Sequence, residues 1–449
     1  MLSADSIRSP AAALSVAVRL SRSVEARDGR RHATRGSGFC RASGMPVPNF
    51  QQTPEASSGE TMSHDHAARM GHIRDSVSAP SSPPIYQTAA FDIPDLDVLH
   101  GMIRGESDGH IYTRDSNPNH LALAESIALL EGTEAGSVFA SGMSALSSVF
   151  LALASTGDHV IVAKALYGRT LELALRCAER FSIELSMVDA RDVQAFSRAV
   201  TPRTRFALIE TVSNPMLEVA DVEAIAESLG AVPLVVDSTF TTPELIQPCR
   251  LGAAVTIHSA SKYLNGHGDL MLGVAAASRH MVKKLNETTS IFGLNANPFD
   301  CWLCQRGIRT LPLRMKQICA TTQTLAEFLN GHSAVRSVFH PSLPQHPSHE
   351  LASRMYPQGT GGIISFELNG GGQSAVNQFM HAAVNIPFSP TLADCRTTLS
   401  HPASTSHRYM TSQERADLGI CDELIRLSVG LEPPEMLREE IDAALKAVD

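Results

Sequence analysis

The sequence predicts an α/β fold with a mostly parallel sheet, followed by a smaller α+β domain. From about residue 126 to about residue 313, short apolar segments typical of buried strands alternate with helical stretches. Strands that alternate with helices form βαβ units and parallel sheets. After Leu313 the order becomes a helix, a strand at Gly362–Leu368 and another helix, which is typical of an α+β arrangement.

The first 75 residues differ from the rest in composition. Up to Met45 the chain holds eight Arg and no Lys, with abundant Ser and Ala, which is typical of an organelle transit peptide. However, Asp5, Glu25 and Asp28 interrupt the amphipathic pattern of residues 1–45. We therefore expect residues 1–75 to be a disordered or transit-like extension. We favour a non-structural extension or a misplaced start, with a cytoplasmic protein, over organelle targeting.

Hydrophobic spacing defines the elements that follow. Ala122–Leu130 carries apolar residues at helical spacing, and the helical stretch Ala220–Leu229 ends at Gly230. The predicted buried strands are His159–Ala163, Arg205–Ile209, Leu234–Val236 and Ala253–Ile257.

Composition argues against several classes of protein. With 37 basic and 46 acidic residues the net charge is −9, which disfavours binding to nucleic acid. Eight cysteines in 449 residues are too sparse for a disulfide scaffold. The uncharged stretch 135–157 is about long enough to cross a bilayer, but it is rich in Ser and Gly. We interpret it as a buried helix and expect no membrane partner.

Two residues at strand ends indicate a cofactor. Asp237 follows the apolar run that ends at Val236, and Lys262 lies among hydroxyl residues just past the next strand. Because the carboxyl ends of parallel strands border one crevice, these side chains are expected to face the same site. Pyridoxal phosphate needs a lysine for its Schiff base and a carboxylate beside its pyridine nitrogen. On spacing alone, the alternative stays open that Asp237 caps a helix and Lys262 is a surface lysine.

A phosphate cradle is predicted at Ala140–Ser144. Gly142 lets backbone N–H groups approach an anion, and the apolar helix that begins there points its positive end at it. The alternative is an ordinary helix N-terminus with Ser141 as its cap.

A series of short motifs runs from about Ser82 to the C-terminus. They are Pro84–Thr88, Tyr112–Arg114 with Asn117–Pro118, Leu130–Gly132, Ser141–Met143, Leu166–Gly168, Glu210–Pro215, Val236–Phe240, Ile257–His267, His401–Ser404 and Arg426–Glu432. In these motifs and their order, the chain resembles the pyridoxal-phosphate-dependent transsulfuration family. This family includes cystathionine γ-synthase, cystathionine γ-lyase, methionine γ-lyase and O-acylhomoserine sulfhydrylase.

The resemblance implies a fold and an assembly. The fold would be aspartate-aminotransferase-like, which is fold type I of the pyridoxal phosphate enzymes. Residues 76–116 would form an arm that contacts the neighbouring subunit, 117–313 the cofactor-binding α/β domain and 314–449 the C-terminal α+β domain. The assembly would be a homotetramer built from two active dimers.

The resemblance also implies the roles of matching residues. Lys262 would form the Schiff base and carry protons, Asp237 would pair with the pyridine nitrogen, and Tyr167 would stack on the ring. Asn214 would lie near the 3-hydroxyl of the cofactor, and Arg426 would bind the substrate α-carboxylate with its planar fork. The implied phosphate ligands are Gly142, Met143, Ser259 and Ser261, with Tyr112 and Arg114 from the neighbouring subunit.

Departures from the family motifs concern the substrate pocket. Arg169 stands where the family has Gly, or Cys in methionine γ-lyases, and Thr391 begins a segment where the family has Ser-Leu-Gly. Arg396 stands where the family often has Glu. We expect Thr391, Arg169 and Arg396 to contact the substrate, the arginines by receiving a distal carboxylate such as a succinyl group. The alternative is that the arginines pair with local acids such as Glu172 or Asp394 and face solvent.

These observations predict a pyridoxal-phosphate-dependent enzyme that acts at the γ-carbon of a small amino acid. We favour γ-replacement on an O-acylhomoserine by cysteine or sulfide. One alternative is γ-elimination, as in cystathionine or methionine γ-lyase, and another is a non-catalytic binding protein with the same fold. No metal is expected, because Cys301 and Cys304 have no second pair and are interpreted as buried helical thiols.

Overall fold

The computed structural model of the chain describes residues 80–408 and 410–448, which lie in one compact unit, Ala56–Asp449. The expectations for residues 1–75, including a transit peptide, fall outside the described residues. The α-helices are α1 (Leu96–Arg104), α2 (Pro118–Glu131), α3 (Gly142–Leu153), α4 (Gly168–Phe181), α5 (Val193–Ala199), α6 (Val222–Leu229), α7 (Thr242–Leu245), α8 (Arg279–Phe292), α9 (Pro298–Ile308), α10 (Leu311–Asn330), α11 (His349–Met355), α12 (Gly372–Ala382), α13 (Ser412–Asp417) and α14 (Pro434–Lys446). Two 3-10 turns are η2 (Pro248–Leu251) and η3 (Pro402–Ser404).

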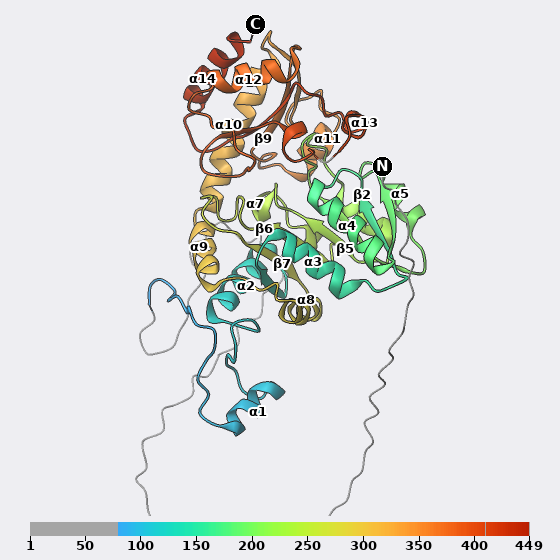
Figure 1. The fold of residues 1–449 in the computed structure, drawn as a ribbon, viewed down its shortest axis with the longest axis vertical. Helices are drawn as coiled ribbons and strands as arrows, with labels where there is room; N and C mark the ends of the chain where they lie inside the picture. The colour runs from blue at the N-terminus through green and yellow to red at the C-terminus, as the bar shows by residue number, and fades with distance from the viewer. Residues whose placement is uncertain (1–79, 409, 449) are drawn as a thin grey trace, which may run out of the picture. The chain divides into compact units, whose positions relative to one another are not determined.

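The larger sheet of the described residues has seven strands in the order β1-β7-β6-β5-β4-β2-β3 (Figure 1). The strands are β1 (Ala135–Phe139), β2 (His159–Ala163), β3 (Glu184–Val188), β4 (Thr204–Glu210), β5 (Leu234–Asp237), β6 (Val255–Ser259) and β7 (Gly273–Ala277). In this sheet β7 is antiparallel to both of its neighbours, β1 and β6, and the other neighbouring pairs are parallel. The prediction of a mostly parallel sheet is therefore confirmed. The carboxyl ends of β4, β5 and β6 therefore lie side by side.

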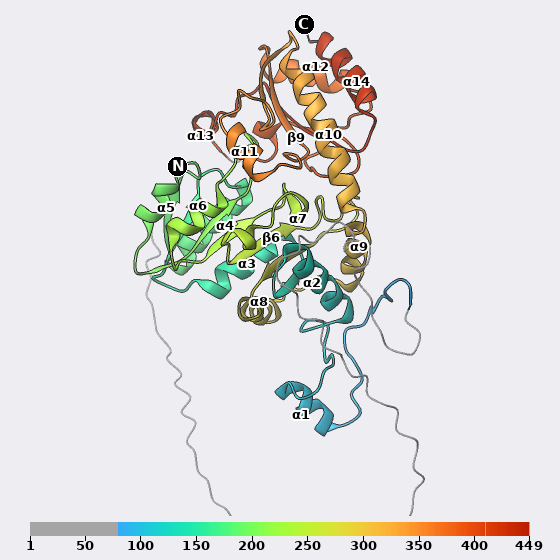
Figure 2. The ribbon, with the colours of Figure 1, turned by 180° about the vertical axis from the view of Figure 1, so that it is seen from behind.

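A second, antiparallel sheet has the order β10-β11-β9-β8. Its strands are β8 (Val335–Phe339), β9 (Ile363–Leu368), β10 (Thr398–Ser400) and β11 (Leu424–Ser428). The long helix α10 connects the two sheets, as Figures 1 and 2 show. Ile318 of α10 packs in the core of the larger sheet, and Leu325 packs in the core of the smaller one. The boundary expected after residue 313 falls near the start of this helix.

Local sequence signals explain how the elements that frame the site begin. Asn117 caps α2 by accepting a hydrogen bond from the Asn119 backbone N–H, and Pro118 occupies the first helical position. The helix ends at Gly132, whose φ of 66° is the left-handed conformation that favours glycine. Ser141 caps α3 by accepting from the Ser144 N–H at 3.0 Å.

Some predicted elements differ from the structure. The stretch 135–157 is not one helix, because β1 and α3 divide it at Ala140 and Ser141. The strand expected from Ala253 begins at Val255, since Ala253 still closes the η2 turn by donating to the Pro248 carbonyl. In the described part of the chain, no helix is long and apolar enough to cross a membrane.

Candidate active site

A cavity of about 730 Å³ opens at the carboxyl ends of β4, β5 and β6. It is lined both by residues of the larger sheet and by loops that precede and follow β10. Ten of the residues predicted from the sequence line it: Gly142, Met143, Tyr167, Asn214, Asp237, Ser259, Ser261, Lys262, Thr391 and Arg426. Residues that are far apart in the chain therefore meet in one site.

Lys262 lies just past the end of β6 and reaches across the cavity. Its Nζ donates a hydrogen bond to the Thr391 hydroxyl at 2.9 Å. Burial, together with the positive charge of Arg426, lowers the pKa of Lys262 to about 8. A lysine with this pKa has a substantial neutral fraction near neutral pH, as a nucleophilic amine requires.

Asp237 and Glu210 end neighbouring strands and are register partners. Thr239 donates to Asp237 Oδ1 from its backbone N–H at 3.0 Å and from its hydroxyl at 2.5 Å. Burial raises the pKa of Asp237, while these bonds and the charge of His258 oppose the rise. Burial and the nearby Asp237 raise the pKa of Glu210 well above its usual value. Burial therefore favours the protonated form of both carboxyls, while the two bonds from Thr239 favour the ionised form of Asp237.

The start of α3 forms a narrow cradle against β6. A Cβ at Gly142 would lie 2.8 Å from the Cβ of Ser259, so only glycine fits there. The positive end of α3 and the Ser259 hydroxyl thus border the same small space. This arrangement suits an anion such as a phosphate.

Arg426 on β11 closes the other side of the cavity. Its Nη1 donates to Asn214 Oδ1 at 3.0 Å and its Nη2 to the Thr391 carbonyl at 3.2 Å. Its Nε is buried and has no hydrogen-bond partner. Burial lowers the pKa of Arg426 to about 10, so the side chain stays charged at neutral pH. A buried cation that faces a cavity in this way suits a bound carboxylate.

Four predicted residues do not line the cavity. Tyr112 and Arg114 lie in the segment before α2, where the guanidinium carbon of Arg114 stands 5.2 Å from the centre of the Tyr112 ring. Arg169 forms an ion pair with Glu172 at 2.5 Å, as the alternative interpretation expects. Arg396 is exposed, and its side chain reaches no cavity-lining position. The argument from extra positive charge at Arg169 and Arg396 therefore loses its structural support.

The cavity also contains residues to which sequence reasoning gave no role. Glu210 binds the Tyr167 backbone N–H at 2.6 Å and so caps α4, whose own N-terminal residue supplies no side-chain cap. Asp394 and Arg408 line the outer part of the cavity. The position of Glu210 at a strand end was a usable signal, whereas nothing local marks Arg408, which reaches the site through the path of its loop.

The cysteine pair of α9 is placed as expected. Cys301 and Cys304 are both buried in this helix. Burial raises the pKa of Cys304 to about 12, so it is an inert thiol at neutral pH.

Comparison with known proteins defines the family. The chain matches the model of the Cys/Met metabolism PLP-dependent enzymes over residues 65–446, and it belongs to this family. It is 41% identical over 370 residues to an L-methionine gamma-lyase of Pseudomonas putida, which covers 81% of this chain and 92% of that protein. It is 39% identical over 347 residues to an O-succinylhomoserine sulfhydrylase of Pseudomonas aeruginosa, which covers 77% and 85%.

A solved structure with the same fold is cystathionine gamma synthase from Xanthomonas oryzae pv. oryzae in complex with aminoacrylate and cysteine. It superposes with a TM-score of 0.81 at 33% identity and covers 87% of this chain and 99% of that one. The chain is therefore a pyridoxal-phosphate-dependent enzyme of the transsulfuration family with fold type I, and these sequence predictions are confirmed. The alternative of a non-catalytic binding protein is not supported.

The residues of the cavity fit this cofactor. The Gly142 cradle leaves room for a phosphate, Asp237 supplies a buried carboxylate, and Lys262 supplies an amine of lowered pKa. The buried and unpartnered Nε of Arg426 remains available for a substrate carboxylate.

Proposed function

We propose that Lys262, Asp237 and Tyr167 hold and use the cofactor. Lys262 bonds covalently to pyridoxal phosphate, Asp237 pairs with its pyridine nitrogen, and the Tyr167 ring packs against it. Asn214 lies near the 3-hydroxyl, and the phosphate binds at the cradle of Gly142, Met143, Ser259 and Ser261. The support for this proposal is the meeting of all these residues in one cavity.

We propose that Arg426 binds the α-carboxylate of an amino-acid substrate beside Thr391. The bound cofactor supplies an electron sink for carbanions next to the amino-acid nitrogen. With cofactor and substrate bound, the Lys262 amine would take and deliver the protons at Cα and Cβ and at the leaving group on Cγ. The hydrogen bond to Thr391 orients this amine toward the substrate side of the cavity.

For the reaction itself, we propose γ-replacement on an O-acylhomoserine by cysteine or sulfide. The observation that carries this choice is Arg408, which lines the same cavity as Lys262 and Arg426 and whose Nη1 donates to the Thr405 carbonyl at 3.0 Å. A guanidinium at this place suits a distal carboxylate, such as that of a succinyl group or of cysteine. Arg408 thus takes the role that we expected of Arg169 and Arg396.

A second candidate is γ-elimination. It is favoured by the 41% identity to an L-methionine gamma-lyase. Methionine carries no distal carboxylate, so its elimination would make no use of Arg408, whereas cystathionine carries one on its cysteine half.

A kinetic comparison separates the two candidates. We would measure kcat/KM for O-succinylhomoserine, O-acetylhomoserine, cystathionine and methionine, each with and without sulfide and cysteine. We expect O-succinylhomoserine to be preferred, and Arg408→Ala to lower its kcat/KM by about threefold to tenfold while sparing O-acetylhomoserine. Arg396→Ala is the matched control and should change neither. A preference of the wild-type enzyme for methionine or cystathionine would favour the lyase.

We also propose that the active site is shared in a dimer, two of which form a tetramer. Tyr112 and Arg114 lie outside the cavity of their own chain, and Tyr112 is 42% exposed. In the same arm, α1 buries only Gly101 and exposes Leu96 and Ile103. These exposed groups suit a contact with a second copy, in which Tyr112 and Arg114 reach the partner's phosphate cradle.

Subunit mixing tests the shared site. Lys262→Ala and Arg114→Ala enzymes are each expected to be nearly inactive, but hybrids of the two contain one intact site. Recovery of activity after unfolding and refolding the two variants together supports sharing. If the mixture stays inactive while a refolded wild-type control recovers, each chain carries its own complete site.

A further inference from the structure

Behind the cavity, a buried polar pair lies on the opposite side of the sheet from the Ser259 side chain. His258 of β6 precedes Ser259, and successive side chains of a strand point to opposite faces. His258 Nε2 lies 2.6 Å from Oε1 of Glu131, the last residue of α2. Both side chains are almost fully buried, at 1% and 0% exposed. Neither residue lines the cavity.

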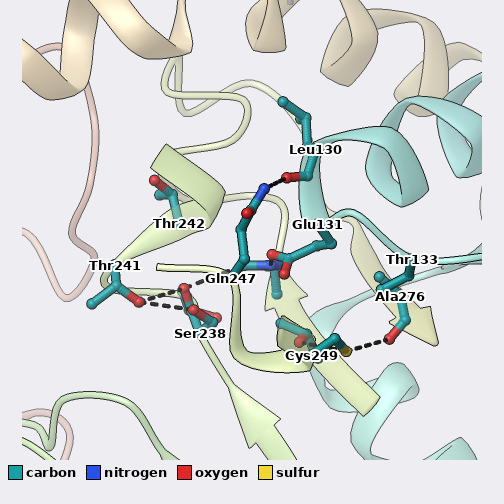
Figure 3. Close-up of polar contacts among 12 residues, drawn as sticks. Leu130, Glu131, Thr133, Ser238, Thr241, Thr242, Gln247, Cys249 and Ala276 are labelled. Carbon is teal, nitrogen blue, oxygen red and sulfur yellow. Dashed lines mark hydrogen bonds and ion pairs between the residues drawn. The ribbon is translucent and has the colours of Figure 1, made fainter. Parts of the chain in front are cut away.

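The end of α2 holds Glu131 firmly in place. The Gly132 backbone N–H donates hydrogen bonds to two carbonyls of the last turn, those of Ala128 and Leu129. The Gln247 side-chain amide donates to the Leu130 carbonyl, as Figure 3 shows. Glu131 therefore meets His258 from a helix end in which the three preceding carbonyls each accept a hydrogen bond.

The other nitrogen of His258 reaches the chain next to Asp237. Its Nδ1 lies 3.1 Å from the Ser238 carbonyl oxygen. A carbonyl can only accept, so Nδ1 carries a proton and donates it. Ser238 is held a second time by its hydroxyl, which bonds to Thr241 at 2.8 Å (Figure 3).

One peptide group links this bond to the cavity. The Ser238 carbonyl and the Thr239 N–H belong to the same planar peptide. That N–H donates to Asp237 Oδ1 at 3.0 Å. A hydrogen bond to the carbonyl fixes the peptide plane and polarises its N–H as a donor. The chain of contacts thus runs from Glu131 through His258 and one peptide to the Asp237 carboxylate.

We propose that Glu131 and His258 are positioning residues for Asp237. Glu131 sets the orientation of the imidazole, and the imidazole orients the peptide that donates to the Asp237 carboxylate. Asp237 lies beside a second carboxyl, that of Glu210, which disfavours a charge on Asp237. The Thr239 N–H that donates to Asp237 favours the ionised form of Asp237. This inference rests on the proposed pairing of Asp237 with the pyridine nitrogen.

Two substitutions of His258 separate its two bonds. The amide nitrogen of Asn occupies the place of Nδ1, so His258→Asn keeps a donor for the Ser238 carbonyl. The amide of Gln occupies the place of Nε2, so His258→Gln keeps the contact with Glu131 but loses that donor. We expect His258→Gln to raise the Kd for pyridoxal phosphate by about 10–100-fold. This is the range seen at metal sites when a hydrogen-bond partner of a metal-binding residue is removed. His258→Asn loses only the contact with Glu131, so it should raise the Kd by a smaller factor, similar to that of Glu131→Ala.

A matched control is available in the same sheet. His159 of β2 is also buried and bonded through both ring nitrogens, but its partners are Thr204 and Ser186, which are not next to Asp237 and do not line the cavity. His159→Gln should lower the midpoint of urea unfolding without changing the Kd. The Kd is measured by the visible absorbance of the bound cofactor, and unfolding by fluorescence of the same preparations.

The outcomes are distinguishable. Wild-type Kd values for both His258 variants would overturn the inference, and so would equal losses in both that only track unfolding, as in His159→Gln. If Asp237→Ala itself keeps the wild-type Kd, the proposed role of Asp237 fails instead.

Glu131 is tested by coupling. Glu131→Ala should weaken cofactor binding in the wild-type background but add little in the His258→Asn background, where its contact is already lost. Equal effects in both backgrounds would remove Glu131 from the inference.

Discussion

The two walls of the cavity are built in different ways. The inner wall consists of strand ends, where Glu210, Asp237 and Ser259 sit on hydrogen-bonded neighbouring strands and are supported from behind. The outer wall consists of loops, which contribute Arg408 and the segment around Ala393. Strand ends hold groups within narrow limits, whereas loops tolerate change. We therefore propose that the inner wall holds the cofactor and that the outer wall sets substrate selectivity.

The charged groups of the two walls also differ in their exposure to solvent. In the inner wall, buried groups have shifted pKa values, as for Glu210 and Lys262. In the outer wall, Arg408 is exposed and Asp394 is half-buried, so solvent screens both charges. Substitutions in the inner wall should therefore lower activity more than substitutions in the outer wall.

The largest expected effect is that of Lys262→Ala. Without its amine, the enzyme should lose at least about 10³-fold in kcat and form no covalent bond to the cofactor. Borohydride treatment followed by peptide mapping checks the bond. Lys164→Ala, which removes an exposed lysine outside the cavity, is the control. Label retained on another lysine would contradict the assignment.

Arg426→Lys should have the next largest effect. The charge is kept, but one ammonium cannot reproduce the planar fork that bonds both Asn214 and Thr391. We expect kcat/KM to fall by about 10–100-fold, mostly through KM, for every substrate tried. Arg396→Lys at an exposed site should be silent. If kcat/KM fell only for substrates with one acyl group, Arg426 would bind that acyl group and not the α-carboxylate.

The lowered pKa of Lys262 predicts a pH dependence. Only the neutral amine captures pyridoxal phosphate, and burial brings the pKa from 10.5 to about 8. Capture by the cofactor-free protein should therefore speed up about tenfold per pH unit below 8 and level off above it. Stopped-flow absorbance from pH 6 to 10 measures this profile. A rate that keeps rising toward pH 10.5 would mean that the lysine is solvated.

The smallest expected effect concerns the backbone of the outer wall. Ala393 has a φ of 67°, a left-handed conformation that costs a residue with a Cβ about 1 kcal/mol. Ala393→Gly should therefore raise the free energy of unfolding by roughly 0.5–1 kcal/mol in urea titrations. Ala416→Gly in α13 is the control and should lower it, because its backbone is helical. Destabilisation by Ala393→Gly would show that the loop gains more from the methyl group than it loses.

Sequence patterns predicted β2, β4, β5 and β6 of the larger sheet, because parallel strands buried on both faces are continuous apolar runs. They placed β1 in a helix and did not predict β3 or β7. The predicted strand His159–Ala163 has the same first and last residues as β2. The predicted strand Leu234–Val236 ends one residue before β5 does. The smaller sheet was predicted less completely. Of its strands only β9 was expected as a strand, since β8 and β10 alternate in burial or are very short.

By itself, the sequence predicted the residues of the proposed cofactor site that line the cavity. Strand ends mark Asp237 and Lys262, and a cap followed by glycine marks the cradle, because these signals are local. Only the tertiary structure decided which arginines line the cavity. Arg169 turns to Glu172, Arg396 stays exposed, and Arg408 lines the cavity. The direction of a long side chain on a loop depends on neighbours that are distant in sequence, and no local pattern encodes them.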